Sequence, residues 1–325
     1  MTHQLSRWLL LAGALLAAAA LPAHAQVMTV TDGTNSTSTC TSFTLAAGGV
    51  VTLSPTGCLV AVPPPPPPPS TTRLYNLSTR MQVQTGANVL IGGLVIGGTT
   101  AKQVVIRARG PSLASAGITG VLANPVLQLF SGPNVIATND DWGSASNAAA
   151  ILATGFAPTL ATESAILMTL SPGPYTAIVT GLGDTSGVGI IEAFEVDQPA
   201  APFINISTRG PVLTVNDVMI GGFIIQGTSP QTVLVRARGP SLASAGVTGA
   251  LANPRLQLFS LATEISSNDD WGTASNVAQI QASGLAPSDP LESVILITLN
   301  PGAYTAIVSG VGGTTGVGIV EVFAQ

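Results

Sequence analysis

The sequence predicts an all-β protein: two tandem antiparallel β-sandwiches of jelly-roll type, preceded by a small disulfide-clipped β-hairpin and a polyproline linker. Residues 74–196 align without a gap with residues 203–325, and 73 of 123 positions are identical. In each copy, short apolar runs rich in β-branched residues alternate with Gly, Pro, Asn and Asp, as in sandwiches. Each copy is long enough to bury its own core, so we expect two independent domains, 74–197 and 203–325.

The first 25 residues have the pattern of a bacterial secretory signal peptide. Arg7 precedes an apolar run over 8–20, and Ala-His-Ala ends the segment as a cleavage site. No later apolar run reaches the roughly 18 residues of a membrane span, because paired glycines at 92–93 and 221–222 interrupt the longest ones. We therefore expect a secreted protein without a transmembrane segment, in the periplasm, at the cell surface or outside the cell.

Residues 26–62 are expected to form a small β segment. The runs 42–45 and 50–53 flank a small-residue stretch at 46–49, which fits a hairpin. Cys40 and Cys58 are the only cysteines, and an oxidising compartment makes a disulfide between them the default expectation. Residues 63–73 begin with seven consecutive prolines, which predict a polyproline II spacer of roughly 20 Å.

Within each repeat the strands are expected to be short and the helices few. One turn of helix is expected at 146–154, with its counterpart at 275–283. The expected strands of the first repeat are 103–109, 126–130, 165–170, 175–179 and 189–194.

The composition excludes several classes of function. Both histidines, His3 and His24, lie in the signal peptide, so the mature chain has no Ser-His-Asp triad, Cys-His pair or histidine-bound metal. Removing Arg7 from the ten basic residues leaves nine against fifteen acids, a net charge of −6. Because phosphate binding needs a basic surface, we expect no nucleic-acid partner.

The string RARGPSLASAG occurs at 107–117 and again at 236–246. Two arginines two residues apart on a strand face the same way, so Arg107 and Arg109, like Arg236 and Arg238, could bind an anionic ligand. The alternative is a structural ion-pair network. The charges that match between the repeats favour that alternative, since arginines and acids are nearly balanced: Arg80, Arg107, Arg109, Asp140, Asp141, Glu163 and Glu192, with Arg209, Arg236, Arg238, Asp269, Asp270, Glu292 and Glu321.

A second repeated string, NDDWG, offers three oxygen-bearing side chains in a row. Such a run is a candidate Ca²⁺ site, the only cofactor that we consider, or else an Asx turn that caps backbone N–H groups. Trp142 and Trp271, the only tryptophans of the mature chain, could stack on a sugar ring or cover the edge of the core. The candidate metal ligands are Asn139, Asp140, Asp141, Asn268, Asp269 and Asp270.

Three segments of the first repeat, 139–141, 172–179 and 185–189, resemble bacterial prepeptidase C-terminal (PPC-like) domains. Those are jelly-roll-like β-sandwiches appended to secreted enzymes and surface proteins. The NLSTR/NISTR, IGG and RARGPSL strings resemble tandem modules of large exported bacterial proteins. The resemblance covers both repeats but not 26–73, and it implies an accessory role. Similar collagen-binding modules hold Ca²⁺ with acidic loops, of which only the Asp-Asp pair is matched here.

These patterns together predict a non-enzymatic exported surface or extracellular protein for adhesion or binding, with a polysaccharide or a cell-surface protein as partner. One alternative is a filament or matrix subunit that self-associates by strand addition to a neighbour's sheet edge. Another is a glycoside hydrolase that uses carboxylates alone. Its acid pair would be Glu163 with Glu192, or Asp141 with Glu163.

Overall fold

The computed structural model describes residues 26–28, 43–45, 51–53, 59–61, 72–197 and 202–325. Thr72–Gln325 falls in one compact unit, and Ala14–Thr71 in another. The predicted signal peptide, both cysteines and the seven prolines lie outside the described residues, so the disulfide and the spacer stay predictions. No helix in the described ranges is long and apolar enough to cross a membrane.

The N-terminal segment contains four short strands in two separate sheets. β1 (Gln26–Met28) pairs with β2 (Phe43–Leu45), and β3 (Val51–Leu53) pairs with β4 (Leu59–Ala61), both antiparallel. The positions of β2 and β3 were predicted, but the hairpin between them is wrong, because each strand has another partner.

The two repeats contain equivalent strands in the same order, but η1 of the first repeat has no counterpart in the second, and η2 of the first corresponds to the α-helix α3. The first contains β5 (Arg73–Val83), η1 (Gly86–Asn88), β6 (Leu90–Ile96), β7 (Lys102–Arg109), η2 (Pro111–Ala116), β8 (Pro125–Ser131), β9 (Asn134–Asn139), η3 (Trp142–Ser144), α2 (Ala148–Ala153), β10 (Ser164–Leu170), β11 (Gly173–Gly181), η4 (Leu182–Asp184) and β12 (Gly187–Glu195). The second contains β13 (Phe203–Val212), β14 (Met219–Gln226), β15 (Gln231–Arg238), α3 (Pro240–Ser244), β16 (Pro254–Ser260), β17 (Thr263–Asn268), η5 (Trp271–Thr273), α4 (Val277–Ala282), β18 (Ser293–Leu299), β19 (Gly302–Gly310), η6 (Val311–Gly313) and β20 (Gly316–Ala324).

The all-β class is confirmed, and the five strands predicted in the first repeat match β7, β8, β10, β11 and β12 within two residues at each end. The two predicted helical turns are α2 and α4. The predicted and observed strand positions agree because buried and partly exposed residues alternate along the strands. Along β6, Leu90, Gly92, Leu94 and Ile96 are buried while Ile91, Gly93 and Val95 are partly exposed, which is the period-two pattern of a strand with one face on the core.

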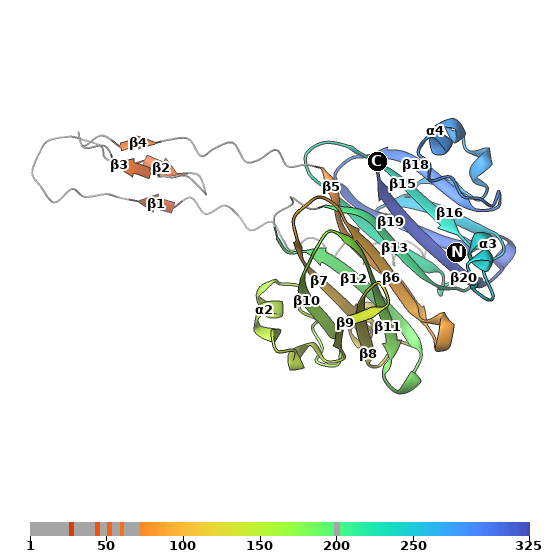
Figure 1. Ribbon diagram of the computed structural model, residues 1–325, viewed down its shortest axis with the longest axis horizontal. Helices are drawn as coiled ribbons and strands as arrows, with labels where there is room; N and C mark the ends of the chain where they lie inside the picture. The colour runs from red at the N-terminus through yellow and green to blue at the C-terminus, as the bar shows by residue number, and fades with distance from the viewer. Residues whose placement is uncertain (1–25, 29–42, 46–50, 54–58, 62–71, 198–201) are drawn as a thin grey trace, which may run out of the picture. The chain divides into compact units, whose positions relative to one another are not determined.

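The strands of unit 72–325 form two long antiparallel ladders, each of which runs through both repeats (Figure 1). One has the order β10-β7-β12-β5-β14-β19-β16-β17, and the other has the order β18-β15-β20-β13-β6-β11-β8-β9. The ladders touch where Phe203 of β13 pairs with Leu74 of β5. Each repeat therefore contributes four strands to each ladder.

This pairing corrects the prediction of two independent sandwiches. β5 of the first repeat pairs with β14 of the second over seven residue pairs, and β13 of the second pairs with β6 of the first over six. The two junctions are equivalent, since β13 and β14 are the counterparts of β5 and β6. Thr79 and Thr208, which are 129 residues apart and occupy the same place in the two repeats, share a buried hydrogen bond of 2.7 Å between their hydroxyl groups. The repeats are thus related by an approximate twofold axis.

The hydrophobic core also extends across both repeats. One continuous cluster of buried side chains takes members from both repeats and from both ladders, including Leu77 and Met81 of β5, Leu94 of β6, Ile206 of β13 and Phe223 of β14. Burial of apolar surface is the main favourable contribution to folding. Because this cluster extends across the junction, neither repeat keeps all of its buried neighbours without the other.

Candidate functional site

The arginines of the RARGPSLASAG string form an internal ion-pair cluster. Arg107 and Arg109 leave the same face of β7, and Glu192 lies on the adjacent strand β12, directly opposite Arg107. Both Nε groups donate to Oε2 of Glu192 at 2.7 Å. The two arginines are only 8% and 9% exposed and the glutamate 5%, so the structural alternative describes the site better than an open anion fork.

The guanidinium group of Arg107 has further partners besides Glu192. Nη1 of Arg107 donates to the carbonyl oxygen of Phe156 at 2.7 Å, and its guanidinium lies 5.0 Å from the ring centroid of Phe194. Arg236 and Arg238 repeat the arrangement around Glu321, with Arg236 also bonded to the carbonyl oxygen of Leu285. Burial alone would raise the pKa of Glu192, but the positive charges of Arg107 and Arg109 outweigh it and lower the pKa.

The rest of the string builds the turn that follows β7. Glu163 is fully buried, and its Oε1 accepts hydrogen bonds from the backbone N–H groups of Gly110 and Ser112 at 3.1 and 2.9 Å. A Cβ at Gly110 would lie 2.0 Å from the carbonyl oxygen of Leu122, so glycine is required there by close approach. Glu292 binds Gly239 and Ser241 in the same way. The repetition of the string is thus explained by folding.

The NDDWG string covers the outer edge of one ladder. Asn139 accepts a hydrogen bond from the N–H of Ala165 at 2.9 Å, and Trp142 donates its backbone N–H to the carbonyl of Glu163 at 2.9 Å. Farther along the edge, Asn147 donates to the carbonyl of Leu167. Asn268, Trp271 and Asn276 cap β18 identically. These groups occupy main-chain positions of β10 and β18 that an added strand would need.

The predicted calcium site is not assembled. The side chain of Asn139 is used on β10 and on the carbonyl of Asp141. Oδ1 of Asp140 accepts the N–H of Asp141, so a carboxylate caps a backbone N–H group, although one residue on and not two as in an Asx turn. In the part of the chain that the structure describes, no group of three or more His, Cys, Asp or Glu side chains gathers as a metal site would require. In the second repeat, Asn268 and Asp269 line a hollow of about 490 Å³ together with Arg255, whose charge opposes a cation.

The tryptophans cover small apolar clusters instead of standing free for a ligand. Trp142 is half-buried and packs against a cluster of Val105, Ile151, Ala165 and Leu167 under α2. Trp271 packs against the equivalent cluster and donates its Nε1–H to the carbonyl of Asp289 at 3.2 Å. Their position fits the core-edge alternative and leaves a sugar-stacking role without support.

We expect Asn139→Ala to destabilise the protein by about 1–3 kcal/mol, because it leaves main-chain groups of β10 without their partner. It should also promote self-association, since the edge of β10 is then open to another strand. Denaturant unfolding and size-exclusion chromatography would check both effects. Asn134→Ala, at an exposed position of the same strand, is the matched control. Equal behaviour of the two variants would contradict the capping role.

One charged cluster has no counterpart in the second repeat, where Gln231 and Ala324 stand in place of Lys102 and Glu195. Lys102 is fully buried and lies 3.3 Å from both Glu195 and Asp197, and Arg73 donates to Glu195 at 3.0 Å. Burial raises the pKa of Glu195 in spite of Lys102 and Arg73. The cluster ties the start of β5 to the end of β12 and to the linker, and the presence of a single lysine in the chain was the only signal for it.

Lys102→Gln is expected to cost about 1–3 kcal/mol of unfolding free energy, because Glu195 keeps Arg73 but loses a second charged partner. Since the pKa of Glu195 is higher in the folded than in the unfolded state, its contribution to stability is complete at acidic pH and is lost as pH rises through the folded value. The defect should therefore be smaller at acidic pH. Lys102→Gln with Glu195→Ala, which installs the residues of the second repeat, Gln231 and Ala324, should recover most of the loss in urea melts. A double variant no more stable than the single one would contradict this.

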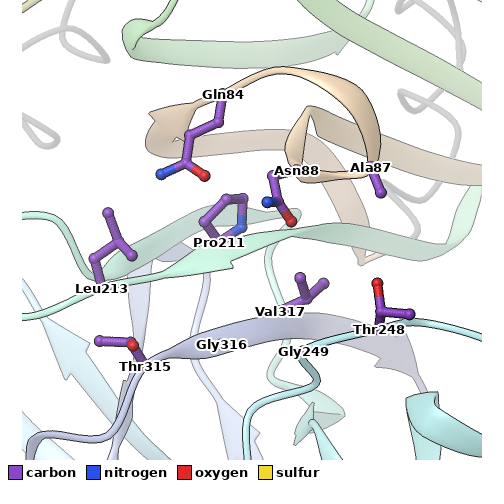
Figure 2. A pocket seen from close by; sticks show the side chains of 10 residues that line it. All are labelled: Gln84, Ala87, Asn88, Pro211, Leu213, Thr248, Gly249, Thr315, Gly316 and Val317. Atoms are coloured by element: carbon purple, nitrogen blue, oxygen red, sulfur yellow. The ribbon is translucent and has the colours of Figure 1, made fainter.

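An open pocket of about 320 Å³ lies between the repeats (Figure 2). The turn around η1 of the first repeat supplies Gln84, Ala87 and Asn88, and the second repeat supplies the rest. Figure 2 shows this turn facing the start of β20, with Pro211 of β13 between them. The contributions of the second repeat are Pro211, Leu213, Thr248, Gly249, Thr315, Gly316 and Val317.

No family model matches the chain, and no curated protein matches it. Among solved structures, a chain from the Sulfolobus turreted icosahedral virus is similar at 10% identity and a TM-score of 0.21, over 78% of this chain and 90% of that one. PNGF-II is similar at 10% identity and a TM-score of 0.21, over 79% of this chain and 58% of its own. At such low TM-scores neither likeness supports a conclusion about fold or function, and the chain is assigned to no family.

Proposed function

We propose that the chain is a non-enzymatic exported protein of the bacterial cell surface or extracellular space that binds a polysaccharide or a surface protein. The observation that carries this proposal is that the charged residues matched between the two repeats form bonds inside the fold. Arg107, Arg109 and Glu192 of the first repeat, with Glu163, are buried and bonded within the fold. Their counterparts in the second repeat make the same kinds of bonds, and the two glutamates there are buried while the two arginines are partly buried. What remains for a partner is a hydroxyl-rich surface with few charges, on a chain in which only 8% of the residues are charged.

A carboxylate-only hydrolase would need two acids that face a cleft and exchange protons with substrate. Glu192 is held by two guanidinium groups and Glu163 by two backbone N–H groups, so neither acid is free to do so. Their burial therefore favours binding without turnover.

The filament alternative needs an open sheet edge. β9 and β17 each carry a register irregularity next to their partner strand, which bends an edge away from pairing, and β10 and β18 are capped by the NDDWG strings. The edges of unit 72–325 thus disfavour strand addition, and the alternative would depend on the N-terminal segment.

The proposal is tested with the full chain after export. Fractionation of producing cells should recover the tagged protein outside the cytoplasm, and washed cells or their extracted polysaccharide should deplete the purified protein from solution. Reducing ends should not be released. Release of reducing ends that Glu163→Gln abolishes in a folded protein would overturn the non-enzymatic proposal, and a monodisperse protein that no surface fraction depletes would overturn binding.

A further inference from the structure

We propose that the pocket between the repeats binds a neutral, hydroxyl-rich ligand of monosaccharide size, such as one pyranose unit of a glycan. This inference rests on the proposed binding function and names its site. Its volume of about 320 Å³ lies at the small end of the usual range for ligand pockets, roughly 300–1,000 Å³.

The lining favours an uncharged ligand. None of its ten residues is Asp, Glu, Lys or Arg. Two carboxamides, Gln84 and Asn88, and two hydroxyls, Thr248 and Thr315, can both donate and accept hydrogen bonds. A sugar hydroxyl needs this combination, whereas a carboxylate or ammonium group would lose its hydration without gaining an opposite charge.

The carboxamides are free to bind a ligand. Among the described residues, neither side chain has a hydrogen-bonding partner, although both are half-buried. The turn is held instead by its backbone, with the N–H of Gln84 bonded to the carbonyl of Asn88 at 3.1 Å. Figure 2 shows the Asn88 amide and the Thr248 hydroxyl turned into the space between the turn and β20.

The opposite wall is rigid and partly apolar. Val317 is buried and exchanges backbone hydrogen bonds with Gly249 and Leu251 at 2.8 and 2.9 Å. A Cβ at Gly316 would lie 2.7 Å from the Cα of Leu251, so the two segments meet without side chains between them. Leu213, which also lines the pocket and is partly exposed, offers apolar surface on which the C–H face of a sugar can rest. A preformed wall lowers the entropic cost of binding.

The site is not duplicated by the twofold axis. The counterparts of Gln84 and Asn88 in the second repeat are Leu213 and Asp217, so both carboxamides are lost and a charge is introduced. We therefore expect one site per chain, although the repeats are otherwise closely alike.

The experiment is saturation-transfer NMR and calorimetry of the full chain with glucose, galactose, mannose and N-acetylglucosamine, and with glucuronate as the charged comparison. At least one neutral sugar should bind with a stoichiometry of one, and glucuronate at least tenfold more weakly. Asn88→Ala and Gln84→Ala should each weaken binding about tenfold, and Thr248→Trp should abolish it by filling the pocket. Thr119→Trp, at the exposed counterpart of Thr248, should leave the affinity unchanged.

Two results would overturn the inference. Sugar binding that survives Thr248→Trp in a protein of unchanged thermal stability would place the ligand elsewhere and leave the proposed function standing. The inference would also fail if no neutral sugar bound while washed cells still depleted the protein. If neither the sugars nor the cells bound it, the proposed function would fail as well.

Discussion

A chain cut to residues 203–325 is expected to lose its monomeric state, whereas residues 72–325 should stay monomeric and unfold in one cooperative transition. In the cut chain, β13 loses β6 and β14 loses β5, so two central strands become exposed edges. Long apolar edges of this kind pair with whatever strand is available. The twofold arrangement also offers a specific outcome, since β13 and β14 of two cut chains can pair with each other as the repeats do here.

Light scattering after size-exclusion chromatography and thermal melts over a range of concentrations would check this expectation. The cut chain should be dimeric or aggregated, with a melting temperature that rises with concentration. The uncut unit should show no such dependence. A monomeric cut chain that melts at the temperature of the uncut unit would show that the second repeat has a complete core of its own.

Glu192→Ala is expected to cost about 3–5 kcal/mol of unfolding free energy, because it leaves the guanidinium groups of Arg107 and Arg109 buried without their shared acid. That is a large part of the 5–15 kcal/mol typical of a folded domain, so the variant should be only marginally stable. Arg109→Ala should destabilise in the same direction. Glu264→Ala, at an exposed acid of β17, is the control and should change stability by roughly 0–1 kcal/mol.

The same cluster should make stability depend on acid. The pKa of Glu192 is lower in the folded than in the unfolded chain, so its contribution is complete above the ordinary value of 4.5 and is lost as pH falls below it through the folded value. Urea melts between neutral and acidic pH should show this loss in the wild type and a flatter profile in Glu192→Gln. Sulfate should not stabilise the wild type. An Arg109→Ala protein of unchanged stability that had lost a stabilisation by sulfate would instead show that the string binds an outside anion.

Strand positions could be predicted because a strand with one buried face has buried residues at every second position. In β8, for example, the buried Leu127 and Leu129 alternate with half-buried residues. The partners of the strands at the junction between the repeats, β5, β6, β13 and β14, could not be predicted. Ladder hydrogen bonds join backbones and have no side-chain signature. Because the two repeats are nearly alike, β6 would accept either β5 or β13 by pattern alone, and the sequence could not distinguish pairing within a repeat from pairing between repeats.

The same contrast holds for the candidate sites: features that depend on residue types could be predicted, and features that depend on which strands are neighbours could not. The matched charges predicted an internal ion-pair network, and Glu192 was among the acids considered for Arg107 and Arg109. The roles of Asn139 and Asn268 were missed, since a strand's outward carbonyl and N–H groups cannot be located before its neighbours are known. Lys102 was missed because its partners are Glu195, at the end of β12, and Asp197 of the linker. The second repeat has Ala324 in place of Glu195 and ends one residue after it.

The approximate twofold axis affects how the protein behaves when it is strongly diluted. Two separate modules joined by the same edges would be an ordinary dimer, whose population falls as the protein spreads into a large volume. Here residues 197–202 tether the two halves, so their encounter is intramolecular and is set by an effective concentration that the surroundings do not change. A protein predicted to leave the cell would thereby keep its paired form, and the pocket that depends on both halves, at any dilution.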